Sequence, residues 1–444
     1  MQLYQKITSL VESGFPRFGV NKKREIIRLL YEISKRDNIF PEEIIKCINQ
    51  NKFYDAKEFL LKRRFPYAYS HNELSNPNLP DIKIDTKERL VIKKKSFYPK
   101  EIFIEKSVQT SYVANKFRKF FPNAVFLEIE SLKAYIKKTQ GSTISDYNNR
   151  CNSAFIINEI YDFFKKCPCT KGAETCGYHI FNLGFGCIFE CTYCYLQQYV
   201  NSPGLIFPAN IDDYFNAFNS YKSAGMRIGT GEFSDSLMLD DITEYSVPII
   251  DFFKKQKDVM FEFKTKSSNI ENLLKTKHSG NIVTAWSLNP QSIIATNEFY
   301  TASLAERIEA ALQCAEAGYK VAFHFDPIFY YKGWEKDYEQ VIDCLFTKIK
   351  LKHIAWISVG TLRFNPELKK IIETRFPENT ILDAELIPGY DNKLRYPYSM
   401  RYNIYKSIID MMRKHHKKAP IYLCMEEKSI WRSLNLALPF NKTK

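Results

Sequence analysis

The spacing of apolar residues differs between the first 70 residues and the rest of the chain. In residues 1–70 apolar positions recur three or four apart, which predicts helices; the clearest run is Ile26, Ile27, Leu29, Leu30 and Ile33. A polar stretch with prolines follows, and such stretches between periodic segments are typical of linkers. We therefore expect a helical N-terminal appendage over residues 1–70 and a linker over residues 71–99.

Short apolar runs then alternate with helical spacing. Ile102–Ile104 and Ala124–Leu127 have the length and composition of strands, each followed by a helical pattern, near residues 108–121 and at Leu132–Ile136. We expect a small α/β subdomain over residues 100–178, which ends in a cysteine-rich stretch.

From residue 179 onward, strand patterns alternate regularly with helical ones. A helix predicted over Leu304–Ala317 closes on Gly318, a residue type suited to the left-handed end of a helix. Such alternation predicts parallel βαβ units, and these strands are too few for a closed eight-stranded barrel. We expect an α/β fold with an open, partial (β/α)6 barrel of the TIM type over residues 179–444. The predicted strands are His179–Phe185, Met226–Thr230, Val259–Thr265, Asn281–Leu288, Lys320–Pro327 and His353–Leu362.

Charged residues occupy one side of the predicted barrel strands. Glu262, Lys264 and Lys266 alternate with phenylalanines, and His324 and Asp326 share a side in a later strand. A parallel strand covered on both faces is normally apolar throughout. The pattern therefore predicts a polar barrel lumen.

The chain carries three closely spaced cysteines after the first predicted barrel strand. Cys187, Cys191 and Cys194 follow the spacing C-x3-C-x2-C, with Tyr193 just before the last. Three thiolates can hold three corners of a cubane iron–sulfur cluster and leave its fourth iron open for a ligand. Zinc is the alternative, although structural zinc sites use four Cys or His ligands.

Composition bears on where the protein acts and on what it binds. No apolar run is long enough for a transmembrane helix, and the N-terminus lacks the pattern of a secretory signal, so we expect a cytoplasmic protein. Lys and Arg outnumber Asp and Glu by 64 to 50, a formal charge of +14. This excess favours an anionic partner, nucleic acid first, unless it serves only solubility.

The cysteine spacing resembles that of radical S-adenosylmethionine (SAM) enzymes. In these enzymes the loop carries a [4Fe–4S] cluster, and SAM binds the open iron. The segment Gly229–Leu237, in which the second predicted barrel strand ends, is similar to their Gly-Gly-Glu segment, which binds the amino group of SAM. The resemblance implies SAM contacts from Gly231, Glu232 and Ser234.

Further motifs resemble the spore photoproduct lyase, or DNA-photolyase-like, branch of these enzymes. The resemblance covers roughly residues 100–430 and leaves out the helical appendage. The matching pieces are Cys194-Tyr195-Leu196-Gln197, Tyr199-Val200-Asn201, Thr265-Lys266, Leu273-Leu274, Ser287-Leu288-Asn289, Ala317-Gly318-Tyr319-Lys320, Asp326-Pro327-Ile328, Gly333-Trp334-Glu335, Arg363-Phe364 and Arg401-Tyr402.

The resemblance implies roles for particular residues. Lys266 and Ser287 are expected to contact SAM, and Tyr193 and Tyr195 to relay a radical. Residues 394–405 resemble the region that meets the damaged DNA strand, where guanidinium groups bind phosphate and aromatic rings stack on extruded bases. Packing of this segment against the barrel is the alternative. The expected DNA-binding residues are Arg395, Tyr396, Arg401 and Tyr402.

The implied function is that of a radical SAM lyase in DNA repair. The cluster and SAM would generate a 5′-deoxyadenosyl radical that acts on a pyrimidine lesion in DNA. We expect a monomer that receives electrons from a donor such as flavodoxin or ferredoxin. We do not expect it to bind a membrane. Two alternatives stay open: radical modification of RNA or another substrate, and a non-enzymatic, zinc-containing nucleic-acid-binding protein.

The chain departs from the family at one point. The lyases carry a hydrogen-donating cysteine just after the second barrel strand, whereas no cysteine occurs here between Cys194 and Cys314. Upstream, Cys167, Cys169 and Cys176 form C-x-C-x6-C. These three could bind a second metal, supply the hydrogen donor or pack as small buried residues.

Overall fold

The computed structural model describes residues 2–49, 51–82, 88–92, 97–138, 143–161, 163–199 and 202–437. Parts of the predicted linker, residues 83–87 and 93–96, lie outside the described residues, as do Val200 and Asn201 of the family motif. The chain forms two compact units. One contains residues 1–90, 329–332 and 361–404, and the other contains residues 91–328, 333–360 and 405–444.

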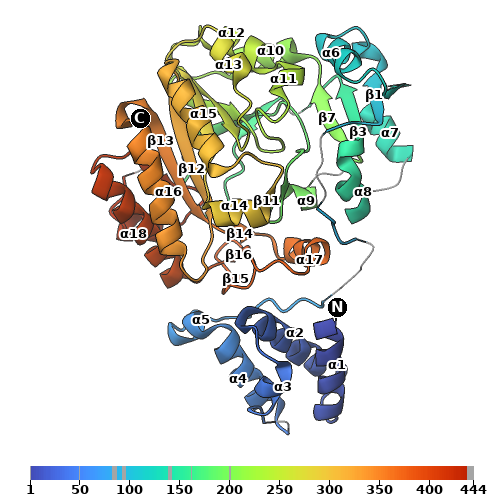
Figure 1. The fold of residues 1–444 in the computed structure, drawn as a ribbon, viewed down its shortest axis with the longest axis vertical. Coiled ribbons are helices and arrows are strands. Elements are labelled where there is room, and N and C mark those ends of the chain that lie inside the picture. Colours follow the sequence, from blue (N-terminus) through green and yellow to red (C-terminus); the bar gives the residue numbers. More distant parts are fainter. Residues whose placement is uncertain are drawn as a thin grey trace. The chain divides into compact units, whose positions relative to one another are not determined.

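The larger unit is built on a curled sheet, which we call the barrel sheet (Figure 1). Its strand order in the described residues is β17-β13-β12-β10-β9-β8-β5-β4. Six of these strands follow chain order, so the predicted α/β fold with an open, partial barrel is confirmed. They are β5 (Tyr178–Phe181), β8 (Met226–Thr230), β9 (Val259–Thr265), β10 (Ile282–Ser287), β12 (Lys320–Ile328) and β13 (Ile354–Thr361).

Two short strands border the predicted ones. β4 (Phe164–Lys166) pairs antiparallel with β5, and β17 (Ile421–Leu423) pairs parallel with β13. β5 ends four residues earlier than the sequence predicts, because the chain turns away through Gly184, whose φ is +146°. The barrel sheet therefore begins and ends in strands that the apolar pattern did not reveal.

Helices cover the outer face of the barrel sheet (Figure 1). α15 shows why they start and stop where they do. A capping box joins Ser303 and Glu306 at its start, and Gly318, with φ of +96°, follows its end. The helices on this face are α10 (Ile211–Tyr221), α12 (Ser246–Phe253), α13 (Glu271–Lys275), α15 (Leu304–Glu316) and α16 (Trp334–Lys348).

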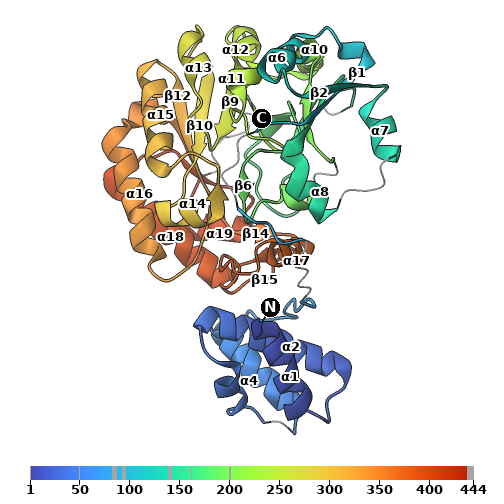
Figure 2. The same cartoon turned by 45° about the vertical axis from the view of Figure 1, so that its right-hand side comes forward.

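A smaller parallel sheet precedes the barrel sheet in the chain, with the order β2-β1-β3-β7. The first three strands come from the predicted α/β region, and two of them, β1 and β2, are labelled at the right of Figure 2. The fourth strand, β7, follows the cysteine loop. The elements are β1 (Glu101–Glu105), α6 (Tyr112–Phe120), β2 (Val125–Ile129), α7 (Leu132–Lys138), α8 (Ile144–Asn149), the short 3₁₀ helix η2 (Arg150–Asn152), β3 (Ser153–Ile157) and β7 (Leu205–Pro208).

The concave face of the barrel sheet carries a buried polar network. His324 Nε2 lies 2.7 Å from Glu262 Oε1, and Trp356 Nε1 donates to the same oxygen at 3.0 Å. These side chains come from β12, β9 and β13. Since β9 and β13 are not neighbours in the sheet, the contact requires a curled sheet with the network inside it. The polar lumen predicted from the alternating charges is therefore present.

The charge states in this network follow from burial and neighbours. Burial alone would raise the pKa of Glu262, but His324 holds it down, to about 2. Burial, followed by Lys264, lowers the pKa of His324. An ionised Glu262 accepts the Nε2 proton of a neutral His324, whose Nδ1 then accepts from Ser358 Oγ at 2.6 Å.

The other compact unit is helical at its N-terminal end. Its helices α2 and α4 supply Arg28 and Arg64, and α17 supplies Lys369; all three cations bond to the buried carboxylate of Glu32, at 2.6, 2.6 and 2.7 Å. The helices are α1 (Gln2–Gly14), α2 (Val20–Asp37), α3 (Pro41–Ile45), α4 (Phe53–Arg64), α5 (Pro66–Ser70) and α17 (Pro366–Arg375). The appendage and residues 361–404 thus share one buried ionic centre within this unit.

This unit also contains a small antiparallel sheet of β14 (Arg363–Phe364), β16 (Leu394–Arg395) and β15 (Ile387–Pro388). Two helix starts are capped from distant parts of the same unit. Glu385 accepts from the backbone N–H groups of Tyr67 and Ala68 in α5, and Glu73 accepts from Tyr398 and Ser399 at the start of α18 (Tyr398–His415). The last described helix is α19 (Lys428–Ser433). None of the described helices is both long and apolar enough to cross a membrane.

Candidate functional site

The three cysteines of the C-x3-C-x2-C spacing lie in one loop between β5 and α9 (Leu196–Tyr199). Within this cysteine loop, β6 (Glu190–Cys191) pairs antiparallel with β11 (Glu298–Phe299). β11 follows α14 (Gln291–Asn297), which follows β10. The loop therefore lies beyond the carboxyl ends of the barrel strands, where ligands bind in parallel α/β sheets.

A fully buried arginine holds the first half of the cysteine loop. Arg150 donates from Nε to the carbonyl of Cys187 at 2.9 Å and from Nη2 to the carbonyl of Phe189 at 2.8 Å. It also pairs with the buried carboxylate of Glu190. Because carbonyls and carboxylate converge on one guanidinium, the loop keeps its shape through side-chain contacts as well as its own backbone.

A second buried ion pair holds the other half. Glu298 lies 2.6 Å from Arg307, and it accepts from the hydroxyl of Tyr193 and from Asn289 Nδ2 at 2.8 Å. Burial alone would raise the pKa of Glu298, but Arg307 and Lys266 hold it down, to about 2. Tyr193, expected to relay a radical, is thus an oriented, buried hydrogen-bond donor to an ionised carboxylate.

Cys187 and Cys191 are buried and Cys194 is partly buried, and Lys266 lies within electrostatic range of the last two. Burial raises the pKa of Cys187, Cys191 and Cys194, while Lys266 opposes the rise at Cys191 and Cys194. Burial alone would lower the pKa of Lys266, but Glu298 and Cys191 raise it, so the side chain stays charged. No residue in the described part of the chain forms a hydrogen bond or ion pair with its ammonium group.

This donor set fits an iron–sulfur cluster. Three thiols from one loop are the ligands of a cluster with an open iron, and cluster iron keeps such thiols deprotonated. Lys266 supplies a positive charge beside the negative charge that three thiolates bring. In the described residues no group of three or more His, Cys, Asp or Glu side chains is already arranged around a single metal ion.

The turn after β8 is fastened to the end of β9. Gly231 has φ of +111°, a conformation that side chains disfavour. Asp235 accepts from Thr265 Oγ1 at 2.6 Å and from the backbone N–H of Lys266 at 2.7 Å. Ser236 Oγ accepts from the backbone N–H of Lys264 at 2.9 Å. The predicted SAM turn is thereby held next to Lys266.

Glu232, the expected partner of the SAM amino group, already faces an ammonium group. Lys165 Nζ of β4 lies 3.2 Å from Glu232 Oε2 and 4.7 Å from the ring centre of Phe233. The hydroxyl of Tyr195 donates to the carbonyl of Glu232. Tyr195 therefore borders the turn and is partly exposed, in contrast to Tyr193.

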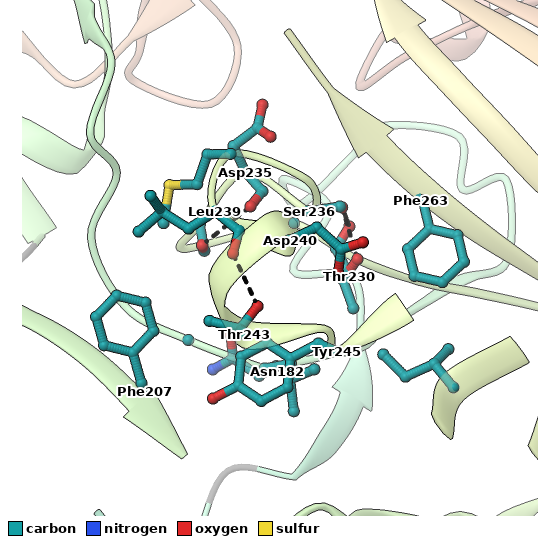
Figure 3. A pocket seen from close by; sticks show the side chains of 16 residues that line it. Asn182, Phe207, Thr230, Asp235, Ser236, Leu239, Asp240, Thr243, Tyr245 and Phe263 are labelled. Carbon is teal, nitrogen blue, oxygen red and sulfur yellow. Dashed lines mark hydrogen bonds between the residues drawn. The ribbon is translucent and has the colours of Figure 1, made fainter. Parts of the chain in front are cut away.

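Figure 3 shows a pocket beside this turn. Gly231 and Ser234 line it, together with the apolar side chains of Phe207 and Phe263, but the three thiols, Glu232, Lys266 and Ser287 do not. The remaining lining residues are Asn182, Leu183, Gly184, Thr230, Asp235, Ser236, Met238, Leu239, Asp240, Thr243, Tyr245 and Ile249. The pocket lies behind the turn, between β7, β8 and α11 (Asp240–Thr243).

Ser287 ends β10 and is buried, and its carbonyl accepts from Arg307 Nη1 at 2.8 Å. It therefore belongs to the Glu298–Arg307 centre that also holds Tyr193. Cys191 and Lys266 lie within electrostatic range of this centre, and Cys194 lies within range of Cys191 and Lys266. Cys187 lies within range of both other thiols, and Tyr195 contacts Glu232 of the turn.

The expected DNA-binding residues lie in the other compact unit and are mostly interior. Arg395 is fully buried and pairs with Asp391 at 2.7 Å, and the hydroxyl of buried Tyr396 accepts from the backbone N–H of Tyr330. Arg401 is buried and donates to the carbonyl of Tyr396 at 2.8 Å. Tyr402 is partly exposed. Three of the four side chains thus shape this segment from inside.

Sequence reasoning missed the residues that hold the site together: Arg150, Asp235, Glu298 and Arg307. Each acts over a long chain separation or in a loop, where no periodic pattern marks it. Asp235 alone had a local signal, since it lies between two serines just after a barrel strand.

The second group of cysteines lies at the edge of the barrel sheet. Cys169 Sγ is 3.9 Å from Cys167 Sγ, and the backbone N–H of Cys167 donates to the carbonyl of Tyr178 at 2.9 Å. The segment is joined to the chain after β17, because Glu174 N donates to Glu426 O at 3.0 Å. Its three cysteines are partly exposed, and none of them is in a disulfide bond.

Comparison with known proteins gives one consistent family. The sequence model of the family described as Spore photoproduct lyase matches residues 97–427. The chain is 29% identical to spore photoproduct lyase of Bacillus subtilis over 242 residues, which cover 52% of this chain and 67% of that protein. It is 30% identical to the enzyme of a Geobacillus species over 233 residues, 51% of this chain and 66% of that protein.

A solved structure agrees with these sequence matches. A spore photoproduct lyase complexed with dinucleoside spore photoproduct has a TM-score of 0.63 and 23% identity to this chain; the alignment covers 74% of this chain and all of that one. The same fold, the cysteine loop beyond its strands and a family match over most of the chain agree with the resemblance seen in the motifs. The chain belongs to the spore photoproduct lyase family.

Proposed function

We propose that this protein is a radical SAM lyase that repairs a pyrimidine lesion in DNA. The observation that carries the proposal is the cysteine loop: three thiols, gathered beyond the carboxyl ends of the barrel strands and held by two buried ion pairs. The curated relatives are spore photoproduct lyases, and the chain spans about two thirds of their length. A solved relative was captured with a dinucleoside lesion.

The cofactors are a [4Fe–4S] cluster and SAM. Cys187, Cys191 and Cys194 would hold the cluster. When bound, cluster and SAM supply a radical that abstracts a hydrogen atom, and the chemistry of that step belongs to the cofactors. For SAM we propose contacts from Gly231, Glu232, Ser234, Lys266 and Ser287.

The protein's own task is to bind, orient and exclude water. Lys266 places a positive charge near the thiols. Asp235 accepts from the backbone N–H of Lys266, and this hydrogen bond aligns the ends of β8 and β9. Glu232 offers a carboxylate to the SAM ammonium group, and Lys165 Nζ lies 3.2 Å from that carboxylate in the structure. Tyr193, tied to Glu298, and Tyr195, at the turn, are the aromatic side chains proposed to carry a radical.

DNA is the proposed substrate partner, in keeping with the charge of +14. Within residues 394–405, Tyr402 provides a partly exposed ring, while Arg395, Tyr396 and Arg401 keep the segment in shape. We also propose a low-potential electron donor such as flavodoxin or ferredoxin, a monomeric enzyme and a cytoplasmic location.

Anaerobic turnover tests the proposal. Wild-type protein and Cys187→Ala would be reconstituted with iron and sulfide, reduced, and given SAM with UV-irradiated DNA or irradiated RNA of matched sequence. We expect 5′-deoxyadenosine from the wild type that rises with irradiated DNA, and none from the variant. Greater stimulation by RNA would overturn the DNA assignment. Stoichiometric zinc without SAM cleavage would overturn the enzyme assignment.

A further inference from the structure

A radical lyase must dispose of one odd electron on its product. When a bond breaks beside a carbon radical, the unpaired electron stays on one fragment, which needs a hydrogen atom to become a closed-shell product. A neutral thiol is the side chain best suited to give one, because its S–H bond is weak. The inference below rests on the proposed function and asks which thiol of this chain faces the chemistry.

Most cysteines outside the cysteine loop are poorly placed for this task. Cys151 is buried in the core of the small sheet, and Cys314 is buried in α15 on the outer face of the barrel sheet. Cys344 lies on α16, also outside, and Cys47 belongs to the helical unit. In the described chain, this leaves Cys424 and the segment from Cys167 to Cys176.

Cys167 continues β4 on the side that faces the site. Its backbone N–H donates to Tyr178 O at 2.9 Å, so the pairing of β4 with β5 continues past Lys166. Side chains therefore still point to alternate sides of the strand at Cys167. Lys165, two residues earlier and therefore on the same side, reaches Glu232 of the SAM turn at 3.2 Å. Cys167 also lies within electrostatic range of Tyr195. The thiol thus shares a side of the strand with a residue that touches the turn.

Cys167 has a second sulfur beside it. Cys169 Sγ lies 3.9 Å away, and the backbone N–H of Cys169 donates to Cys167 O at 2.7 Å. The far end of the segment is pinned by an antiparallel bridge between Ala173 and Glu427. Cys424, in that neighbouring stretch, also lies within electrostatic range of Cys167. The two sulfurs therefore form a pair at the seam between the first and last strands of the barrel sheet.

The ionisation of Cys167 suits a hydrogen-atom donor. The bond from Cys169, followed by burial, raises the pKa of Cys167. A thiol with a raised pKa stays protonated at neutral pH. It keeps its S–H bond, which is what hydrogen-atom transfer requires.

We propose that Cys167 donates the hydrogen atom that closes the substrate radical, and that Cys169 is its redox partner. The S–H bond of Cys167 breaks as the C–H bond of the product forms, leaving a sulfur radical. Cys169 loses its proton and joins that radical in a three-electron S–S bond. One electron from the low-potential electron donor and two protons then restore both thiols, so each closure uses one electron and one proton overall.

Turnover in D2O tests the donor. Thiol protons exchange with solvent, so wild-type enzyme given SAM and dinucleoside spore photoproduct should place one deuterium in the repaired product. Cys167→Ser should lower deuterated product per 5′-deoxyadenosine by at least about tenfold. Cys169→Ser should keep the deuterium in the first turnover and lose later turnovers. Cys176→Ser, from the same segment, is the matched control and should resemble the wild type; iron content verifies that each variant folds and loads.

The outcomes separate this proposal from the function on which it rests. A loaded wild type that leaves the lesion intact overturns both. Repair with undiminished deuterium in Cys167→Ser, or with deuterium lost only in Cys176→Ser, overturns the donor alone. The pairing has its own readout without turnover: peptide mass mapping after mild diamide oxidation should find a Cys167–Cys169 disulfide. A bond from Cys167 to Cys176 or Cys424 would overturn the partnership.

Discussion

The cysteine loop and the upstream cysteine segment hold three cysteines each, yet the protein builds them differently. Around Cys187, Cys191 and Cys194, two buried ion pairs fix the chain through side chains. Around Cys167, Cys169 and Cys176, the fixed contacts are backbone hydrogen bonds to neighbouring strands. Burying a charge costs free energy unless the charge is fully paired. The two buried ion pairs around the cysteine loop therefore indicate that the shape of this loop matters. Cysteine spacing alone does not make this distinction.

The largest difference should appear in iron binding. Cys191→Ala removes one of three thiols from the loop and should lower bound iron by more than the roughly 10- to 100-fold that loss of an outer hydrogen-bond partner costs a metal site. Iron and sulfide per chain after anaerobic reconstitution measure it. Cys176→Ala should keep its iron. Equal losses in the two variants would mean that the two groups of cysteines share one site.

The ion pairs should differ from surface charges in stability. Arg150→Met leaves Glu190 buried without its cation and frees the carbonyls of Cys187 and Phe189. We expect a cost of about 3–5 kcal/mol in the free energy of unfolding, measured by urea denaturation without iron. Lys166→Met, an exposed change beside the other cysteines, should stay within about 0.5 kcal/mol. If Arg150→Met cost as little as Lys166→Met, Arg150 would not be holding the cysteine loop in shape.

Acid should weaken the anchored loop. The pKa of Glu298 is held at about 2, below its ordinary value, so its ionised form stabilises the fold above the unfolded-state pKa. That stability, about 3 kcal/mol, is lost as pH falls from about 4.5 towards 2. In urea titrations the advantage of wild type over Glu298→Gln should be full at pH 7 and shrink below pH 4.5. An advantage that does not change with pH would contradict this assignment.

A smaller effect concerns the cation beside the thiols. Lys266→Met removes a charge that opposes the raised pKa of Cys191 and Cys194. Cluster assembly at pH 7 should slow, and the difference from the wild type should narrow as pH rises, because more of each thiol is then deprotonated. Absorbance at the iron–sulfur bands follows assembly. Lys165→Met, next to the other cysteines, should assemble at the wild-type rate; the same pH shift in both variants would show a general charge effect.

The sequence predicted what regular spacing encodes. β8 and β9 begin and end at the predicted residues, and the cysteine triple lies beyond the strand ends. What it could not predict depends on distant partners. No sequence pattern near Arg150 indicates that it binds a loop nearly forty residues later. The basic and aromatic residues around Arg395 look alike in sequence whether they face solvent or the interior, and only the fold shows that Arg395 pairs with Asp391.

The strand order of the small sheet has a consequence for assembly. β3 leaves that sheet, the chain forms β4 and β5 in the barrel sheet, and β7 returns to pair with β3. The cysteine loop is thus the return path between two sheets, and β11 must also be in place for β6 to pair. The shape of this loop in the folded chain therefore depends on elements of both sheets. A cut in the cysteine loop would therefore separate β4 and β5 from the rest of the barrel sheet and β7 from the small sheet.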